Sequence, residues 1–220
     1  LINKEKYKQL CKDLFLKGIN IQKNIDEVKG DQEYTESEDA AKIELIDLVV
    51  NEIANVCKLK NETEQGIEIH IGPQGEPLLY PELVELISDL KKIDKIKRIS
   101  MDTNGLLLNE KFADDLVHAG LTRFNVSLNS VNKQTCDRLS NRNYNLDHLL
   151  KIIKYIDDKF ASKGKCEIIL APVLLEGIND SEKELDDLIE FSKKLSGFKT
   201  DKNIKIAFQN FLNYPQGRNP

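Results

Sequence analysis

Three segments of the chain alternate apolar and polar residues and then end in small polar residues. They are GIEIHIGPQGEP at 66–77, KRISMDTNG at 97–105 and TRFNVSLNS at 122–130. Because successive side chains of a β-strand point to opposite faces, each segment is predicted to be a strand with one apolar and one polar face. The apolar face would carry Ile67, Ile69, Ile71, Ile99, Met101, Phe124, Val126 and Leu128, and the polar face Glu68, His70, Gly72, Ser100, Asp102, Asn104, Asn125, Ser127 and Asn129.

Helical periodicity follows these strands. Apolar residues at spacings of three and four predict helices over 37–58, 110–119 and about 146–160. Two more helices are expected, one with Pro81 in its first turn and one that opens at the SEKE segment 181–184. The TESE segment at 35–38 is typical of a capping box, and Gly120 is a helix stop.

Further strands are predicted at 18–22, 165–175 and 203–211, the first of them after a helix over 4–17. Strands that alternate with helices form parallel sheets with right-handed crossovers. A closed eight-stranded barrel fills its interior with branched apolar side chains, whereas this interior would be polar. We therefore predict an α/β fold, a partial (β/α)6 TIM-like barrel with parallel strands and a ligand inside. Its outward residues, packed against helices, would include Ile69, Ile99, Val126, Ile168 and Ile206.

The chain is expected to form a single domain over residues 1–220, with an N-terminal helix over about 1–17 and the barrel over about 18–211. No linker rich in proline, glycine or serine divides it, and because it starts at Leu1 and stops at GRNP after a predicted strand, we expect a fragment. Hydrophobic residues make up 40%, charged residues 31%, and the net charge is −5, which gives no general attraction to nucleic acid or anionic membranes. No apolar run approaches the roughly 18 residues of a membrane span and no secretory leader is seen, so a cytoplasmic location is expected.

The sequence resembles the core of the radical S-adenosylmethionine (radical SAM) superfamily. The segment GPQGEPLLYPELVELISDLKK resembles that family's GGEP motif and following helix, and ISMDTNGLLL its TNG turn. NVSLNSVNKQT and APVLLEGINDSEKELDDLIEF resemble two later strands, in the order and spacing of the family. IEIHIGPQGEPLLYPEL together with IAFQNFLNYPQGRNP looks most like archaeal members of uncharacterised activity.

The resemblance implies a cofactor site for S-adenosyl-L-methionine at the strand ends. The GEP backbone would receive the methionine amino group, the fourth-strand polar pair would reach the ribose or carboxylate, and the sixth strand, with Phe208, would contact the adenine edge. Gln74 departs from the motif where its first glycine usually stands. The implied cofactor-binding residues are Gly75, Glu76, Pro77, Thr103, Asn104, Ser127, Asn129 and Gln209.

The family's iron-sulfur motif is missing from these 220 residues. Members carry CxxxCxxC after the first strand to hold a [4Fe-4S] cluster, but KNIDEVKGDQEYTES after 18–22 contains no cysteine. The four cysteines are Cys11, Cys57, Cys136 and Cys166, and none are paired at metal-binding spacing. No metal ligand is therefore assigned in this chain, and the cluster is expected only in the intact protein. An electron donor such as ferredoxin or flavodoxin would be a partner, and the substrate, a small molecule or a protein, is open.

Several polar residues also have a simple structural explanation. His70, Glu68 and Asp102 are expected to hydrogen-bond inside the barrel, because polar groups that face an interior need partners. Lys133, Arg138 and Arg142 would be solvated charges after the fourth strand, and SEKELDDLIE a solvated helix face.

Three functional hypotheses stay open. The first is a radical SAM enzyme core whose cysteine-bearing loop, belonging between Gln22 and about Asp31, is lost from this sequence. The second is a degenerate member without a cluster that acts as a small-molecule-binding or scaffold module. The third is an unrelated barrel aldolase or epimerase with His70, Glu68 or Lys205 as acid or base. A CxxxCxxC motif in the parent gene would select the first.

Overall fold

The computed structural model describes residues 50–51, 53–54, 66–72, 75–199 and 203–210. The chain divides into two compact units, Leu1–Gly66 and Ile67–Pro220. Nearly all described residues, including every described strand, belong to the second unit. The predicted elements at 4–17, 18–22 and 35–38, and most of the helix predicted over 37–58, lie outside the described residues.

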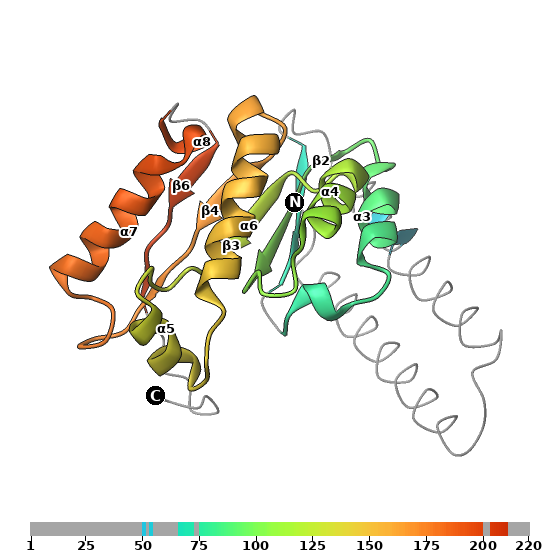
Figure 1. The fold of residues 1–220 in the computed structure, drawn as a ribbon. Helices are drawn as coiled ribbons and strands as arrows, with labels where there is room; N and C mark the ends of the chain where they lie inside the picture. The colour runs from blue at the N-terminus through green and yellow to red at the C-terminus, as the bar shows by residue number, and fades with distance from the viewer. Residues whose placement is uncertain (1–49, 52, 55–65, 73–74, 200–202, 211–220) are drawn as a thin grey trace, which may run out of the picture. The chain divides into compact units, whose positions relative to one another are not determined.

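A parallel sheet of five strands forms the centre of the second unit (Figure 1). Its strands stand in the order β1 (Ile67–Ile71), β2 (Ile96–Thr103), β3 (Arg123–Val126), β4 (Glu167–Leu170) and β6 (Ile204–Ile206). A separate parallel pair joins β5 (Val173–Leu174) to β7 (Gln209–Asn210). The register sets His70 opposite Ser100 and Asp102 opposite Asn125, so polar side chains of neighbouring strands share one face.

Helices connect successive strands and gather on one face of the sheet (Figure 1). Asparagine or serine side chains cap the amino ends of α4, α5, α6 and α7, where they accept hydrogen bonds from backbone N–H groups. The helices are α3 (Leu83–Lys91), α4 (Glu110–Ala119), α5 (Lys133–Ser140), α6 (Leu146–Lys159), α7 (Glu182–Lys194) and α8 (Ser196–Lys199), with short 3-10 turns at Pro77–Leu79 (η1) and Ala161–Lys163 (η2).

The hydrophobic core lies between the sheet and these helices. Ile99, Val126 and Ile168 are buried from the sheet side, as predicted. Leu116 of α4 and Leu149 of α6 are buried from the helix side. The other two predicted outward residues, Ile69 and Ile206, are half-buried because β1 and β6 are the edge strands of the described sheet.

Three predicted elements differ in detail from the structure. Pro81 lies in a turn before α3, whose N-cap is Glu82, so it is not a first-turn proline. The strand predicted over 165–175 is broken between β4 and β5, since Pro172 has no N–H to donate to a ladder. The strand predicted over 203–211 is likewise divided into β6 and β7, and helix α5 was not predicted at all.

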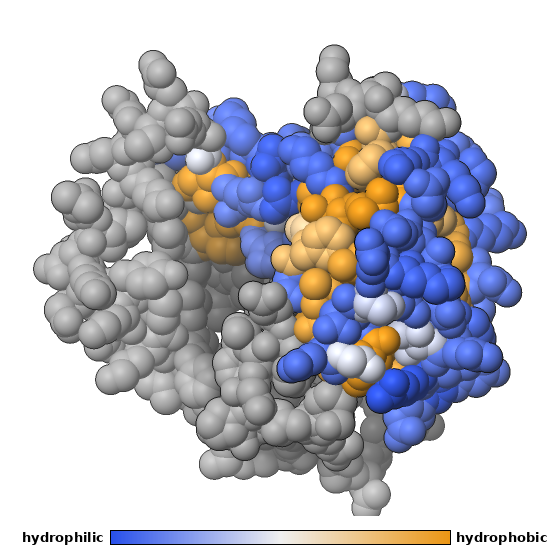
Figure 2. All heavy atoms as spheres, turned by 90° about the vertical axis from the view of Figure 1, so that its left-hand side faces the viewer, coloured by the Kyte–Doolittle hydropathy of each residue, from blue (hydrophilic) through white to orange (hydrophobic). Residues whose placement is uncertain are grey.

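Hydrophilic residues dominate the described surface on the side shown in Figure 2, with hydrophobic residues gathered in smaller patches. The predicted solvated helix face is α7, in which Lys183 pairs with Asp187 and Lys193 with Glu190 on the surface while Leu188 is buried. Among the described residues, none of the helices has the length and apolar character that crossing a membrane requires.

Candidate functional site

Glu76 ties the loop after β1 to the end of β2. Its Oε1 accepts a 2.6 Å hydrogen bond from the Thr103 hydroxyl, and its Oε2 accepts a 2.8 Å bond from the backbone N–H of Asn104. Its Oε1 also accepts a 3.3 Å bond from the N–H of Leu78, which caps η1. The carboxylate of the GEP segment is therefore engaged with protein, and the segment presents its backbone to the site.

The turn after β2 is fixed by its own side chains. Asn104 Oδ1 accepts from the N–H of Leu106 at 3.0 Å, and Thr103 Oγ1 accepts from the N–H of Gly105 at 2.9 Å. Gly105 has φ +72°, and a Cβ there would lie 2.5 Å from Leu149 Cδ1. The glycine of the TNG segment is thus required both by backbone conformation and by the packing of α6 beneath it.

A cavity of about 370 Å³ opens at the carboxyl ends of the strands. Parallel strands bring the residues that follow them to one edge of the sheet, so loops far apart in the sequence meet there. Six of the eight predicted cofactor-binding residues line it, namely Gly75, Glu76, Thr103, Asn104, Ser127 and Gln209, together with Asp102, Asn125 and Ala171.

The other two predicted residues, Pro77 and Asn129, are not among the residues that line this cavity. Pro77 is the first residue of η1. The Oδ1 of Asn129 accepts from the N–H of Val173 at 2.9 Å, and its carbonyl accepts from Asn179 Nδ2 at 2.8 Å. These bonds hold the loop after β3 to β5, and Asn129 lines a second, smaller cavity instead.

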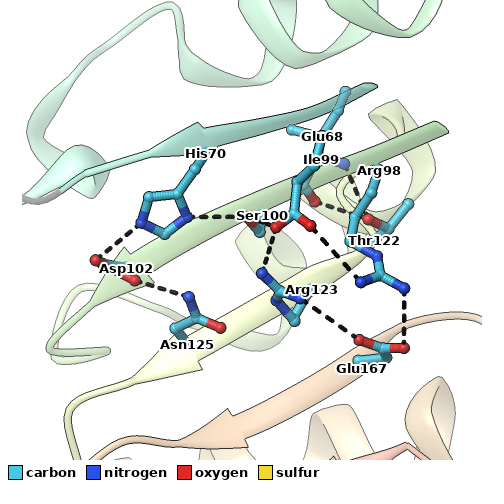
Figure 3. A network of polar contacts seen from close by, with 10 residues as sticks. All are labelled: Glu68, His70, Arg98, Ile99, Ser100, Asp102, Thr122, Arg123, Asn125 and Glu167. Carbon is cyan, nitrogen blue, oxygen red and sulfur yellow. Dashed lines mark hydrogen bonds and ion pairs between the residues drawn. The ribbon is translucent and has the colours of Figure 1, made fainter. Parts of the chain in front are cut away.

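The polar face of the sheet carries a network of hydrogen bonds and ion pairs (Figure 3). Ser100 Oγ donates to Glu68 Oε1 at 2.7 Å, and Arg123 pairs with the same carboxylate. Arg98 lies 3.6 Å from Glu68 and 3.5 Å from Glu167, so two guanidinium groups link carboxylates of β1 and β4. The prediction that Glu68 forms hydrogen bonds on this face is confirmed.

His70 and Asp102 connect this network to the cavity. The His70 ring contacts Ser100 Oγ at 2.9 Å through Nδ1 and Asp102 Oδ2 at 3.1 Å through Nε2, which confirms that both residues are hydrogen-bonded on the inner face. Asn125 Nδ2 donates to the other oxygen of Asp102 at 2.8 Å. Because the Nδ2 of this amide faces Asp102, its Oδ1 points away from that carboxylate, and that oxygen is buried without a partner among the described residues.

Sequence reasoning missed the charged members of the network, Arg98, Arg123 and Glu167. The alternation of faces along a strand could have identified the two arginines. Arg98 shares its face with Ser100 and Asp102, and Arg123 shares its face with Asn125. Asp102 and Asn125 were placed on the polar face, but their part in the cavity wall was not predicted. Of these two residues, Asp102 was the easier to predict, because it directly precedes the TNG turn in the sequence.

The described cysteines do not fit an iron-sulfur site. Burial raises the pKa of the Cys136 thiol to about 11 and that of Cys166 to about 12, so both disfavour the thiolate that binds metal. Within the described ranges there is no group of three His, Cys, Asp or Glu side chains that could hold a metal ion. Cys11 and Cys57 lie outside those ranges.

Comparison with known sequences identifies a family and individual proteins that this chain resembles. Residues 34–189 match the family model of the radical SAM superfamily. An uncharacterised protein of Methanocaldococcus jannaschii is 42% identical over 119 residues, which are 53% of this chain and 26% of that protein. A GTP 3′,8-cyclase of Staphylococcus haemolyticus is 36% identical over 165 residues, 75% of this chain and 44% of the cyclase. The chain thus spans about a quarter to less than half of these relatives.

Solved structures share the fold at low sequence identity. Streptococcus suis SuiB bound to S-adenosylmethionine superposes with a TM-score of 0.51 and 17% identity, covering 69% of this chain and 31% of SuiB. A radical SAM methyltransferase from Sphaerobacter thermophilus superposes with a TM-score of 0.51 and 20% identity, covering 72% of this chain and 45% of the methyltransferase. The family match spans most of the chain, and the parallel sheet agrees with the partial TIM-like barrel of these neighbours. The chain belongs to the radical SAM superfamily.

Proposed function

We propose that this chain is the S-adenosylmethionine-binding core of a radical SAM enzyme whose substrate is unidentified. The observation that carries the proposal is the cavity at the strand ends, because it gathers six of the residues implied by the resemblance from four separate segments of the chain. Family membership supports the same conclusion, since it makes an iron-sulfur protein with a bound S-adenosyl-L-methionine the expected holoenzyme. The proposed location is the cytoplasm.

The chemistry of the cavity wall fits a polar nucleoside ligand. Gly75 has φ +92° and no heavy atom within 4 Å of where a Cβ would stand, so the chain presents bare backbone to the cavity. Asn125 Oδ1, a buried acceptor without a described partner, offers a site for a ligand hydroxyl or amino group. Ser127, which follows β3, and Gln209 of β7 supply further polar groups to the cavity wall.

Bound S-adenosylmethionine would supply a 5′-deoxyadenosyl group as the source of a carbon radical. The part of this chain's own residues is to bind and orient it. The hydrogen bonds of Glu76 hold the backbone of 75–77 against the TNG turn. Asp102 and Asn125 are hydrogen-bonded to each other and form a polar part of the cavity wall. We propose that Gly75, Asn104, Ser127 and Gln209 contact the cofactor and that Glu76 positions the loop.

The described residues do not fit a [4Fe-4S] cluster, so none of them is assigned a part in electron transfer. We propose that the cluster ligands of the intact protein come from residues other than these. An electron donor such as ferredoxin or flavodoxin belongs to the same proposal.

Calorimetric titration with S-adenosylmethionine tests the site. Asn104→Ala and Ser127→Ala should each weaken binding by about 1–3 kcal/mol, because each removes a polar partner of a desolvated ligand group. Glu190→Ala on α7, an exposed carboxylate paired only with Lys193 among the described residues, is the control and should change nothing. Unchanged affinity in both cavity variants would refute the site.

The second hypothesis, a binding module without a cluster, is tested on the native gene. If the full-length protein carries CxxxCxxC, anaerobic reconstitution with iron and sulfide should give a reducible cluster signal by electron paramagnetic resonance and 5′-deoxyadenosine as a product. If neither is found, the enzyme proposal fails and the binding module replaces it. The third hypothesis, an unrelated barrel, is set aside because the chain belongs to the radical SAM superfamily.

A further inference from the structure

A second, smaller cavity of about 80 Å³ adjoins the first. Ser127 lines both, so the two share a wall at the end of β3. The remainder of the small cavity comes from the loop after β3, from which Asn129 was predicted as a site residue, and from the α5 segment, which was not predicted as part of a site. Its lining mixes apolar and polar residues: Leu128, Cys136, Leu139 and Tyr144, with Ser127, Asn129 and Ser140.

Two hydroxyl groups of this lining have no hydrogen-bond partner within the described part of the chain. Ser127 is bonded there only through its backbone N–H, to Thr103 O at 2.9 Å. Tyr144 is bonded there only through its backbone, with its N–H donating to Asp137 Oδ1 at 2.7 Å and its carbonyl accepting from the N–H of Leu146 at 2.9 Å. In contrast, Ser140 Oγ donates to the Cys136 carbonyl and the Asn129 amide oxygen is used by Val173. Neither hydroxyl is used by another described side chain, so both are available to a ligand that enters the cavity.

Tyr144 is held firmly in its place. The Asp137 carboxylate that binds its N–H also accepts two 2.6 Å bonds from Lys133 Nζ, and Lys133 in turn donates to Asn143 Oδ1. Asn141 closes α5 in the left-handed conformation, with φ 50°, and turns the chain back toward the sheet. These bonds fix the backbone from which the Tyr144 side chain extends, which favours a preorganised donor.

Burial of the groups around the small cavity favours an uncharged ligand atom. Burial raises the pKa of Tyr144 to about 12, with Cys136 and Glu76 adding to the effect, so the phenol stays a neutral donor at physiological pH. Burial likewise raises the pKa of Cys136, followed by the negative charges of Glu184 and Asp137. The positive charges of Lys133 and Arg142 oppose these effects, so burial, which disfavours any charged group, is the main reason to expect a neutral oxygen here.

We propose that the Tyr144 hydroxyl donates a hydrogen bond to an uncharged oxygen, such as a sugar hydroxyl, of the ligand that binds beside Ser127. Tyr144, which lines the small cavity beside the cofactor cavity, is then a specificity-determining residue contributed by a loop outside the segments that resemble the family motifs. This inference rests on the proposed binding of S-adenosylmethionine. It assigns the nucleoside half of that ligand, rather than its charged methionyl half, to the side of the cavity that Tyr144 faces.

The test compares three probe ligands, S-adenosylmethionine, adenosine and methionine, on the parent and on Tyr144→Phe. The variant keeps the ring and removes one donor, so binding of both S-adenosylmethionine and adenosine should weaken roughly fivefold to tenfold. Binding of methionine should not change. Tyr155→Phe is the matched control, because its hydroxyl bonds Asp114 on α4 and should leave all three affinities at the parent value.

The outcomes separate this inference from the proposal on which it rests. If the parent binds no S-adenosylmethionine, both fail. If the parent binds it and Asn104→Ala weakens binding while Tyr144→Phe does not, only this inference is overturned. A loss confined to S-adenosylmethionine, with adenosine unaffected, overturns the assignment to the nucleoside half.

A measurement that keeps the hydroxyl in place covers the case in which the variant folds poorly. With 3-fluorotyrosine incorporated, the fluorine resonance of residue 144 should shift on addition of adenosine and stay fixed on addition of methionine. The resonance of residue 155 should respond to neither. A resonance of residue 144 that ignores adenosine contradicts the proposal.

Discussion

At the scale of single residues, the most informative side chain is Glu76, because it binds protein on both oxygens. The resemblance assigned the GEP segment to cofactor binding through its backbone, and the structure gives the carboxylate a separate task. It joins Thr103 and Asn104 to the loop after β1. Loss of this side chain should therefore affect folding as well as binding.

Glu76→Ala should lower the free energy of unfolding by about 1–3 kcal/mol, since it leaves the buried Thr103 hydroxyl and the Asn104 N–H without their acceptor. Urea denaturation followed by circular dichroism measures the change. Glu190→Ala serves as the control and should cost less than about 0.5 kcal/mol, because its ion pair is exposed. Equal stability of the two variants would show that the hydrogen bonds of Glu76 to Thr103 and Asn104 do not stabilise the fold.

The two described thiols should be protected from alkylation in the folded protein. Burial raises the pKa of Cys136 to about 11 and of Cys166 to about 12, whereas a thiol in an unfolded chain has a pKa of about 8.5. Iodoacetamide at a pH of about 8.5, followed by peptide mass mapping, should label both at least about 100-fold more slowly than in urea. Labelling at the unfolded rate would contradict their burial.

The same shift gives a pH dependence of stability. Because the folded pKa lies above the unfolded one, the thiols contribute stability that is fully present below about pH 8.5 and is lost as the pH rises toward 11 and 12. Denaturation midpoints should fall over that interval. A Cys166→Ala variant should show a smaller fall.

At the scale of elements, the sheet depends on strands whose apolar face is completely covered. Val126 is 1% exposed at the end of β3, between strands β2 and β4. Val126→Asp should leave little folded protein, because burial of a valine contributes roughly 1.5–3 kcal/mol and an unpaired buried charge costs several more. Lys97→Asp on an exposed position of β2 is the control. Soluble, folded Val126→Asp protein would contradict the packing.

Strand parity made much of this sheet predictable from sequence. The faces of β1, β2 and β3 follow directly from the alternation in IEIHI, ISMDT and RFNV. Helix α5 was missed because it is short and strongly polar and buries only Cys136, so its sequence has too few apolar residues to show helical spacing. The break after Leu170 was missed because the run 165–175 is largely apolar, and only Pro172 marks the change of partner from β6 to β7.

The residues of the candidate site were predictable where they belong to a strand or to the turn that directly follows it. Thr103 and Asn104 lie at the end of β2, so their place at the sheet edge follows from the strand itself. Tyr144 could not be found in this way, since it reaches the site from a loop 14 residues after Ser130 through a turn held by Asp137 and Lys133. The ion pairs of Arg98 with Glu68 and Glu167 depend on register between strands, which no single segment reveals.

At the scale of the whole molecule, the described sheet carries the candidate site at the carboxyl ends of its strands. The polar network that includes Arg98 and Arg123 runs along one face of the sheet, and Asp102 joins this network to the cavity. The chain accounts for less than half of the curated relatives it matches, so substrate, reaction and partners belong to proposals about the intact protein.

Crystals of the full-length protein grown with S-adenosylmethionine would test the proposed site most directly, through the electron density of the ligand. We expect density in the cavity at the carboxyl ends of β1, β2 and β3, in contact with Gly75, Asn104 and Ser127 and with its ribose beside Tyr144. Density at any other place on the sheet, or a cavity that stays filled only by solvent at saturating ligand, would contradict the proposed site.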